Sequence, residues 1–558
     1  MERGTDGWWR LDVPSAGPGT DYAFVLDGAE RPDPRAQWLP HGVHGPSRVY
    51  DHARHDWADG GWRGVALPGS VFYELHVGTF TPEGTLDAVI HRLDHLVDLG
   101  IDIVELMPVA AFPGVHGWGY DGVALSAVHE PYGGPDALKR LVDACHARGL
   151  GVALDVVYNH LGPSGNYLPR FGPYFTERHH TPWGAAVNLD DQGAHEVRRW
   201  IIDNALMWLR DFHVDALRID AVHALVDDSD VHLLAELSRS VEVLATQVHR
   251  PLSLVAESDL NQPSLVLPRE CGGLGMTAQW SDDFHHALHT LLTGESQGYY
   301  ADFAADPFEA TRATLTAAFF HAGTWSSFRE ALHGAPVDTA QSLGYRFLGY
   351  LQDHDQVGNR ATGDRITATV SAGLAKVGAA LVLTSPFTPM LFMGEEWAAS
   401  TPWQFFTDHQ EPDLAEAVRA GRRREFATHG WRESEVPDPQ DPATFERSRL
   451  DWSELDGAPH AEMLAWHRSL IALRRSEPAL RDPRLEEVSV VADPDERWLV
   501  VRRPGLLVVA NLAAEPHAIS IGTPVVDVVL TSADGTVEWA GDSLTLRAES
   551  VAVIRVAG

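Results

Sequence analysis

The sequence predicts an α/β protein whose centre is a (β/α)8 TIM barrel, with β-rich segments before and after it. Apolar runs able to form buried parallel strands alternate with amphipathic helical stretches along most of the chain. Four of these runs, at residues 151–160, 215–223, 252–258 and 349–359, end in carboxylates, His or Arg. At 558 residues the chain is also too long for one ordinary core, so we expect several domains.

The predicted elements follow in barrel order. Residues 1–66 are rich in Gly, Pro, Asp and Trp and contain short strand-like runs, which indicates part of an N-terminal β-sandwich module. Residues 67–483 form the barrel, and short strands and turns predict an antiparallel β-domain over 484–558. Gly100 is expected to end the first helix. We expect the strands at 71–80, 101–109, 151–160, 215–223, 252–258, 275–280, 349–359 and 389–397, and the first two helices at 85–100 and 135–149.

Composition narrows the class of protein. The net charge of −35 repels phosphate backbones, so nucleic acid is not an expected partner. Two cysteines, Cys145 and Cys271, do not make a disulfide scaffold and fit a reducing compartment, which favours the cytoplasm. The N-terminus lacks the pattern of a signal peptide. The most apolar stretch, 369–394, is interrupted by Lys376 and two prolines, so we expect no membrane span.

The strand ends carry groups suited to breaking a glycosidic bond. Arg218 and Asp220 lie two residues apart, on one face of a strand, and the guanidinium would keep the carboxylate ionised as a nucleophile. Glu257 ends the next strand, where partial burial would let it donate a proton. Asp355, beside His354, could stabilise positive charge on the sugar. Each segment alone could form a structural ion pair, but four in barrel order favour a catalytic mouth.

Further side chains are candidates for sugar contacts. His160 could donate to a hydroxyl, Trp118 and Tyr120 could stack on a sugar face, and Asp121 could bond a hydroxyl or cap a turn. Four Trp residues in loop-like stretches are candidate sugar platforms: Trp183, Trp325, Trp397 and Trp403.

No metal is expected to take part in the chemistry. The run HHALH (285–289) lacks the Glu of the zinc metalloprotease helix. A structural calcium ion remains an alternative, because Asn159, Asp190 and Asp191 could supply oxygen ligands.

Four segments resemble the α-amylase superfamily of retaining glycoside hydrolases. They are DVVYNH, ALRIDAVH, VAES and LQDHDQ. The resemblance implies Asp220 as nucleophile, Glu257 as acid/base and Asp355 as stabiliser. It also implies that Arg218, His160 and His354 contact the sugar beside the cleaved bond, with Tyr120 stacked beneath it.

Longer segments are similar to one family within it, the maltooligosyltrehalose trehalohydrolases. Examples are ELHVGTFTPEGTLDAVI, VAESDLNQP and TAQWSDDFHHALHTLLTGE. The resemblance implies hydrolysis of the α-1,4 bond next to a terminal trehalose of maltooligosyl trehalose, without a cofactor. It also implies a functional partnership with a maltooligosyl trehalose synthase.

Two features depart from that family. The early strands of its N-terminal β-sandwich are expected to be missing, and Asp353 stands where many relatives have Asn. The added negative charge of Asp353 could raise neighbouring carboxylate pKa values.

Three other functions stay open at this point. A glycogen branching enzyme and a starch debranching enzyme share the barrel and its three carboxylates. A non-enzymatic carbohydrate-binding barrel would be expected to lose those carboxylates, and all three are present. Asp259, two residues after Glu257, is the candidate for holding a leaving trehalose, although it could equally cap a loop.

Overall fold

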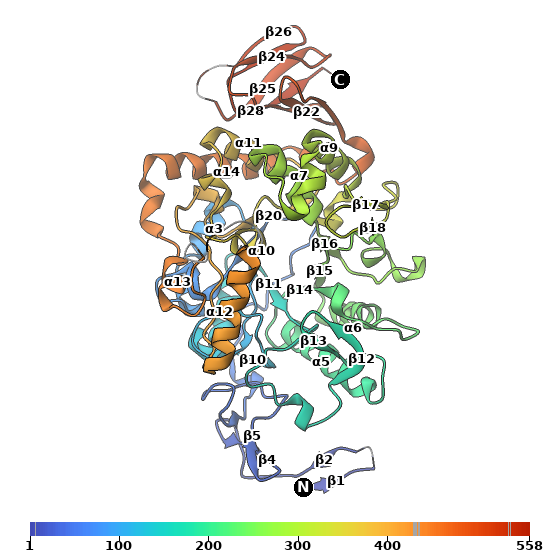
Figure 1. Cartoon of the computed structure of the whole chain (residues 1–558), viewed down its shortest axis with the longest axis vertical. Helices are drawn as coiled ribbons and strands as arrows, with labels where there is room; N and C mark the ends of the chain where they lie inside the picture. The colour runs from blue at the N-terminus through green and yellow to red at the C-terminus, as the bar shows by residue number, and fades with distance from the viewer. Residues whose placement is uncertain (6, 428–431, 433–435, 534, 536, 558) are drawn as a thin grey trace.

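The computed structural model describes the whole chain except residues 6, 428–431, 433–435, 534, 536 and 558. The molecule is elongated, with the N-terminal segment at one end, the barrel in the middle and the C-terminal β-domain at the other end (Figure 1).

Eight parallel strands close the central barrel, as the sequence predicts. They pair in chain order, so that each strand lies between its sequence neighbours and the last, β20, pairs with the first, β7. The strands are β7 (Phe72–Leu75), β8 (Ile103–Leu106), β11 (Gly151–Val156), β14 (Ala216–Ile219), β15 (Ser253–Ala256), β16 (Ala278–Trp280), β19 (Phe347–Gly349) and β20 (Thr388–Phe392).

Helices return the chain between these strands on the outside of the barrel. Gly100 ends the first of them in the left-handed region at a φ of 100°, as expected. The longer helices are α4 (Gly134–His146), α5 (Ala194–Asp211), α6 (Leu233–Val248), α7 (Asp282–Thr293), α9 (Pro307–Ala317), α11 (Ala372–Leu383) and α14 (Ala458–Ser476).

Three predicted boundaries were wrong. The strand expected over 71–80 ends at Leu75, and Val77–Phe80 forms the short helix α1, where the His76 ring and the Thr79 hydroxyl hydrogen-bond across the turn. The helix expected over 85–100 is split into α2 (Leu86–Ile90) and α3 (Leu93–Leu99). The seventh strand was expected over 349–359, but β19 ends at Gly349. Asp353 instead caps the helix α10 (His354–Gly358) within that range.

The interior of the barrel consists of two layers. Side chains alternate along each strand, so one inward residue is followed two positions later by the next. The lower layer is apolar and packed. The layer above it, toward the carboxyl ends of the strands, contains the charged groups of the site. The lower layer holds Phe72, Ile103, Ala153, Ala216, Val255, Ala278, Leu348 and Met390. The residues two positions on include Glu74, Glu105, Asp155, Arg218, Glu257, Trp280 and Tyr350.

Residues 1–66 form two-stranded sheets and irregular chain. The pairs are β1 (Glu2–Arg3) with β2 (Trp9–Arg10), β3 (Asp21–Tyr22) with β6 (Ser47–Arg48), and β4 (Phe24–Leu26) with β5 (Ala29–Arg31). The described part of this segment therefore contains short paired strands, and its assignment as a partial β-sandwich module stays a prediction. The domain boundary at residue 66 stays a prediction.

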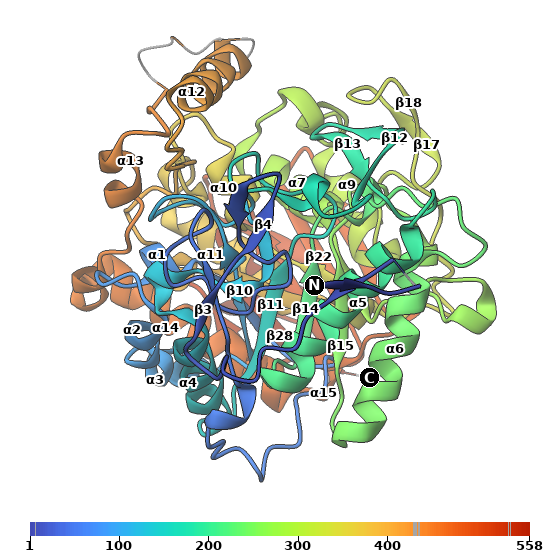
Figure 2. The same cartoon turned by 90° about the horizontal axis from the view of Figure 1, so that it is seen from below.

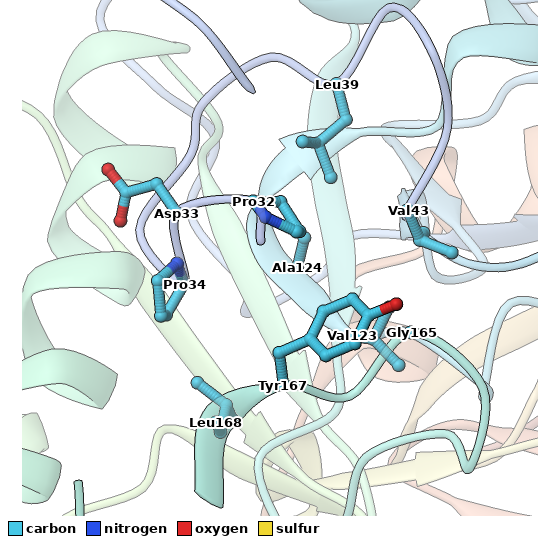
Figure 3. A pocket seen from close by; sticks show the side chains of 10 residues that line it. All are labelled: Pro32, Asp33, Pro34, Leu39, Val43, Val123, Ala124, Gly165, Tyr167 and Leu168. Carbon is cyan, nitrogen blue, oxygen red and sulfur yellow. The ribbon is translucent and has the colours of Figure 1, made fainter. Parts of the chain in front are cut away.

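The N-terminal segment is held by the barrel. Leu39 and Val43 share a core with Val123 and Ala124, next to a cavity of about 20 Å³ (Figure 3). That volume suffices for about one water molecule.

A second contact joins the N-terminal segment to the barrel at the barrel's amino end. There the buried ring of His146, on α4, bridges a carboxylate of the segment and one of the barrel. It lies 2.9 Å from Asp59 and 3.0 Å from Asp215, and Trp62 stacks on it. An ion pair between the segment and the barrel is thus sealed from water.

The C-terminal β-domain is a sandwich of two antiparallel sheets. A five-stranded sheet pairs β21 (Ser489–Asp493), β22 (Trp498–Arg503), β23 (Leu506–Asn511), β28 (Ser550–Val556) and β25 (Val525–Thr531). A three-stranded sheet pairs β24 (His517–Ser520), β27 (Ser543–Leu546) and β26 (Glu538–Ala540), and one apolar core lies between the two sheets. Among the described residues, no helix has both the length and the apolar character needed to cross a membrane.

Candidate active site

Arg218 lies at the centre of a buried charged cluster. Its Nη1 donates to both oxygens of Asp155 at 3.0 Å and to Oδ1 of Asp220 at 2.7 Å, while Nη2 lies 3.8 Å from Oε2 of Glu257. Its guanidinium also lies over the Trp280 ring at 4.4 Å. One buried cation therefore bridges the carboxylates of three neighbouring strands, β11, β14 and β15.

The turn after β14 brings Asp220 and Glu257 together. Ala221 adopts the left-handed conformation at a φ of 38°, which is strained for a residue with a Cβ. This conformation aims its backbone N–H at Oε2 of Glu257, at 2.5 Å. Asn159 donates to the second oxygen of Asp220 at 3.2 Å. Both carboxylates are thus held by fixed donors, and Oε1 of Glu257 is left for a proton.

His354 and Tyr120 connect this cluster to Asp355. The Nδ1 of His354 bonds to the buried carboxylate of Glu74, and its Nε2 lies 2.7 Å from the Tyr120 hydroxyl and 3.5 Å from Asp355. The Tyr120 hydroxyl donates to Asp155 at 2.7 Å. Asp355 is the most open of these carboxylates, with a side chain that is 45% exposed.

Burial and charge set the protonation of these groups. Burial raises the pKa of Glu257 well above its ordinary value; Arg218 opposes the shift and Asp220 adds to it. Burial likewise raises the pKa of Asp155 to about 6. Burial lowers the pKa of His354, but Glu74 and Asp355 outweigh it and raise that pKa to about 10. The site therefore combines a carboxyl group whose pKa is raised, as a proton donor requires, with an imidazole that is charged at neutral pH.

His160 and Asp121 lie at the edge of this cluster. His160 bonds to Asn159 at 2.8 Å and to the Tyr120 carbonyl at 3.0 Å, and the exposed Trp183 stacks on its ring at 4.6 Å. Asp121 is partly exposed and lies 3.8 Å from His409. The structure thus brings both predicted residues beside Tyr120.

Asp259 lies apart from the three carboxylates, on the loop after Glu257. It pairs with Arg329 on the hairpin of β17 (Thr324–Ser326) and β18 (Ala331–His333) and lies 3.8 Å from His223. Its side chain is about one-third exposed. The Asp259 carboxylate is held by Arg329 through Oδ2, and its Oδ1 has no hydrogen-bond partner among the described residues, so it can accept a further hydrogen bond.

Several aromatic predictions were wrong about exposure. Trp118 is buried, stacks on Trp403 at 5.4 Å and donates to the Gln404 carbonyl, so it supports the site from behind. Trp403 and Trp397 are fully buried as well, because the loop after β20 folds back onto the barrel. Trp183 and Trp325 are exposed, as a sugar platform requires.

Sequence reasoning missed three acidic groups of the site. Asp155 pairs in register with Arg218 across β11 and β14, and Glu74 holds His354. Asp282, at the start of α7, accepts a hydrogen bond from Tyr350, and burial raises its pKa to about 7. Strand parity could have found Asp155 and Glu74, because both lie two residues after an inward apolar residue.

Two histidines of the HHALH run bond to other protein groups in the structure. His285 bonds to the Leu351 carbonyl and the Tyr300 hydroxyl, and His289 bonds to Glu295. Within the part of the chain that the structure describes, one group could hold a metal ion: His179, Asp190 and Asp228. The guanidinium of Arg178 already lies 3.8 Å from Asp190 and 3.4 Å from Asp228.

Comparisons with known proteins agree with this geometry. The model of the alpha amylase catalytic domain matches residues 46–174, and a domain of unknown function (DUF3459) matches residues 483–553. A malto-oligosyltrehalose trehalohydrolase from Rhizobium sp. (strain M-11) is 52% identical over 99% of this chain and 92% of its own length. The chain belongs to the malto-oligosyltrehalose trehalohydrolase family.

Other relatives support this membership. A family member from Arthrobacter ramosus is 59% identical over 86% of this chain and 83% of its own. A crystal structure of a Salmonella typhimurium protein described as an alpha amylase is 40% identical, with a TM-score of 0.92 over 100% of this chain and 94% of that one. As a family member the chain is a glycoside hydrolase of the α-amylase family, which the sequence predicts.

Proposed function

We propose that the chain hydrolyses the α-1,4-glucosidic bond next to the terminal trehalose of maltooligosyl trehalose and releases trehalose. The observation that carries this proposal is the near full-length identity to trehalohydrolases, combined with a complete acid and nucleophile pair held by Arg218. The reaction needs no cofactor.

We assign the nucleophile to Asp220. One oxygen accepts from Arg218 and the other from Asn159, so the carboxylate is oriented and its negative charge is stabilised. Attack on the anomeric carbon would form a covalent bond to Asp220 as the bond to the leaving oxygen breaks. Arg218 cannot lose its proton, so it holds its charge through both steps.

We assign the general acid and base to Glu257. Its raised pKa favours the protonated form, and its proton passes to the leaving oxygen as the glycosidic bond breaks. The resulting carboxylate then takes a proton from water, which attacks the glycosyl ester and restores the α-configuration. Asp355 would stabilise the positive charge that develops on the sugar ring in both steps, and the charged His354 would bond a hydroxyl beside it.

Product analysis tests this function. Purified protein incubated with maltopentaosyl trehalose should release trehalose, and the accompanying maltooligosaccharide should first appear as the α-anomer by proton NMR. Incubation with amylose separates the alternatives. New branch points would identify a branching enzyme, and absence of turnover on both substrates would leave a carbohydrate-binding barrel.

We further propose that Asp259 accepts a hydroxyl of the leaving trehalose. The partly exposed carboxylate follows the acid by two residues and is held by Arg329. Asp259→Ala should lower kcat/KM for maltotriosyl trehalose by about 10-fold or more, and change that for maltopentaose less. Asp87→Ala, which breaks a remote surface pair with Arg140, is the matched control. A preference left unchanged by Asp259→Ala would refute this role.

Two broader inferences go with this function. A substrate that ends in trehalose must come from an enzyme that converts the end of an α-glucan, so we infer a functional partnership with a maltooligosyl trehalose synthase. The free cysteines, one of them exposed, support a cytoplasmic location. Detection of a disulfide in the isolated protein would argue against that location.

A further inference from the structure

Asp355 depends on a neighbour for its orientation. It is carried by α10, whose first turn is fixed by the Asp353 cap and by a bond from the Trp403 indole to the His354 carbonyl at 3.0 Å. The Asp355 side chain is much more exposed than that of its neighbour His354, at 45% against 1%. Its closest hydrogen-bond donor is the Asn359 amide, at 3.0 Å from Oδ1, whereas His354 lies 3.5 Å from Oδ2. The Asn359 amide is therefore the main restraint on Asp355.

An asparagine amide can present either its oxygen or its nitrogen. At Asn359 the choice is fixed by Arg422, whose Nη1 donates to Asn359 Oδ1 at 3.3 Å. Turning the amide over would place its NH2 against the guanidinium and its oxygen against the Asp355 carboxylate, and both contacts would be repulsive. The Nη2 of Arg422 also donates to the Gly358 carbonyl at 3.1 Å, where a cation is favourable at the end of α10.

Arg422 reaches this position from a distant part of the chain. It lies on α12 (Pro412–Ala427), which projects from the body of the molecule in Figure 2. Its guanidinium covers the Phe405 ring at 4.7 Å, and α12 is anchored separately by the bond from Arg419 to Asp438 at 2.7 Å. Because Arg419 holds the helix, removing the Arg422 side chain is expected to leave α12 in place.

We propose that Arg422 is a positioning residue for the reaction, acting through Asn359 to hold the Asp355 carboxylate in its working orientation. This proposal rests on the stabilising role assigned to Asp355 under the proposed function.

The first test compares substitutions on one helix. Arg422→Ala should lower kcat about 10- to 100-fold and change KM less than about 3-fold, because orientation matters most in the transition state. Arg422→Lys keeps the charge but cannot make both bonds, so it should recover part of the loss. Arg424→Ala removes an exposed arginine of the same helix and should behave as wild type. Equal thermal midpoints would show that all variants are folded. Wild-type kcat in Arg422→Ala would overturn the proposal.

A double-mutant cycle tests the route through Asn359. If Arg422 acts through that amide, Arg422→Ala combined with Asn359→Ala should be no slower than the slower single variant. Losses that multiply would overturn the proposed route. The variant Asp355→Asn distinguishes a failure of the positioning role of Arg422 from a failure of the stabilising role of Asp355. A large loss in Asp355→Asn without a loss in Arg422→Ala refutes the positioning role alone. Full activity in Asp355→Asn refutes the role assigned to Asp355.

Discussion

A single methyl group at Gly358 should disturb both the stability and the activity of the protein. Gly358 is the last residue of α10, and a Cβ there would lie 2.1 Å from Cζ2 and 2.2 Å from Cη2 of Trp118. Carbon atoms prefer separations of about 3.5 Å or more, so one side must move by more than about 1 Å. Trp118 cannot withdraw easily, because it is buried and stacked on Trp403.

The expected magnitude follows from that overlap. Overpacking of this kind costs about 1–3 kcal/mol. Displacement of α10 by about 1 Å would also move Asp355, and misplacement on that scale costs up to about 100-fold in rate. Gly358→Ala should therefore lower the thermal midpoint and reduce kcat/KM by about 10- to 100-fold.

Calorimetry and steady-state kinetics on maltotriosyl trehalose provide the assay. Gly421→Ala is the matched control: it lies inside α12 with nothing within 4 Å of its new Cβ, so it should be neutral or stabilising by up to about 1 kcal/mol. Adding Trp118→Phe to Gly358→Ala should give a loss smaller than the two single losses combined. A Gly358→Ala variant with wild-type stability and kcat/KM would refute the reasoning.

Further predictions concern the carboxylates, pH and metal. Asp220→Asn and Glu257→Gln should each lower turnover by several orders of magnitude with KM little changed, and retention of about a tenth of wild-type turnover in steady-state assays would disprove that residue's role. Because the pKa of Glu257 is raised, activity should fall as pH rises past that pKa, and a kcat/KM profile whose alkaline limb is identical in Glu257→Asp would point to another group. Burial disfavours the charge on His146, but hydrogen bonds and charges from Asp215 and Asp59 outweigh burial and raise the pKa of His146. The charged ring therefore stabilises the fold fully below the pKa of an unfolded histidine, and this stabilisation is lost as pH rises through the folded-state pKa. Thermal midpoints of wild type should thus fall more steeply above about pH 6.5 than those of His146→Gln, and parallel curves would contradict this. Treatment with a chelator should leave trehalose release unchanged, since carboxylates and water suffice for the chemistry; loss restored by calcium would show otherwise.

Much of the site could be predicted because strand parity and chemistry coincide. Alternation along the fourth strand places Arg218 and Asp220 on one face, and the structure joins them at 2.7 Å. Glu257 follows from the same pattern on the next strand. Strand parity also places Glu74 on the inward face, but it does not specify partners. The contact of Glu74 with His354 and that of Asp282 with Tyr350 join segments far apart in the chain.

The aromatic residues show the limit of local patterns. The stretch around Trp403 contains Pro and Gln and has no periodicity, which predicts an exposed loop. In the structure this loop packs on the barrel, where the Trp403 indole bonds to the His354 carbonyl. Irregular backbone with its side chains buried by tertiary contacts cannot be distinguished from an exposed loop by composition. The irregular stretch that holds Leu39 and Val43 is similar, because these side chains are buried against Val123 and Ala124.

The two layers inside the barrel limit how the chain length can vary. Asp155 and Arg218 project inward two residues after Ala153 and Ala216. The same strand register therefore sets both the lower apolar layer and the charged cluster above it. Deleting one residue within a strand would turn its charged group toward the surrounding helices and an outward apolar side chain into the mouth. Length changes should therefore be confined to the segments between the strands, while the strands keep a fixed residue count. Deletion scanning of the gene, scored for folded protein, should find no tolerated single-residue deletion within any of the eight barrel strands.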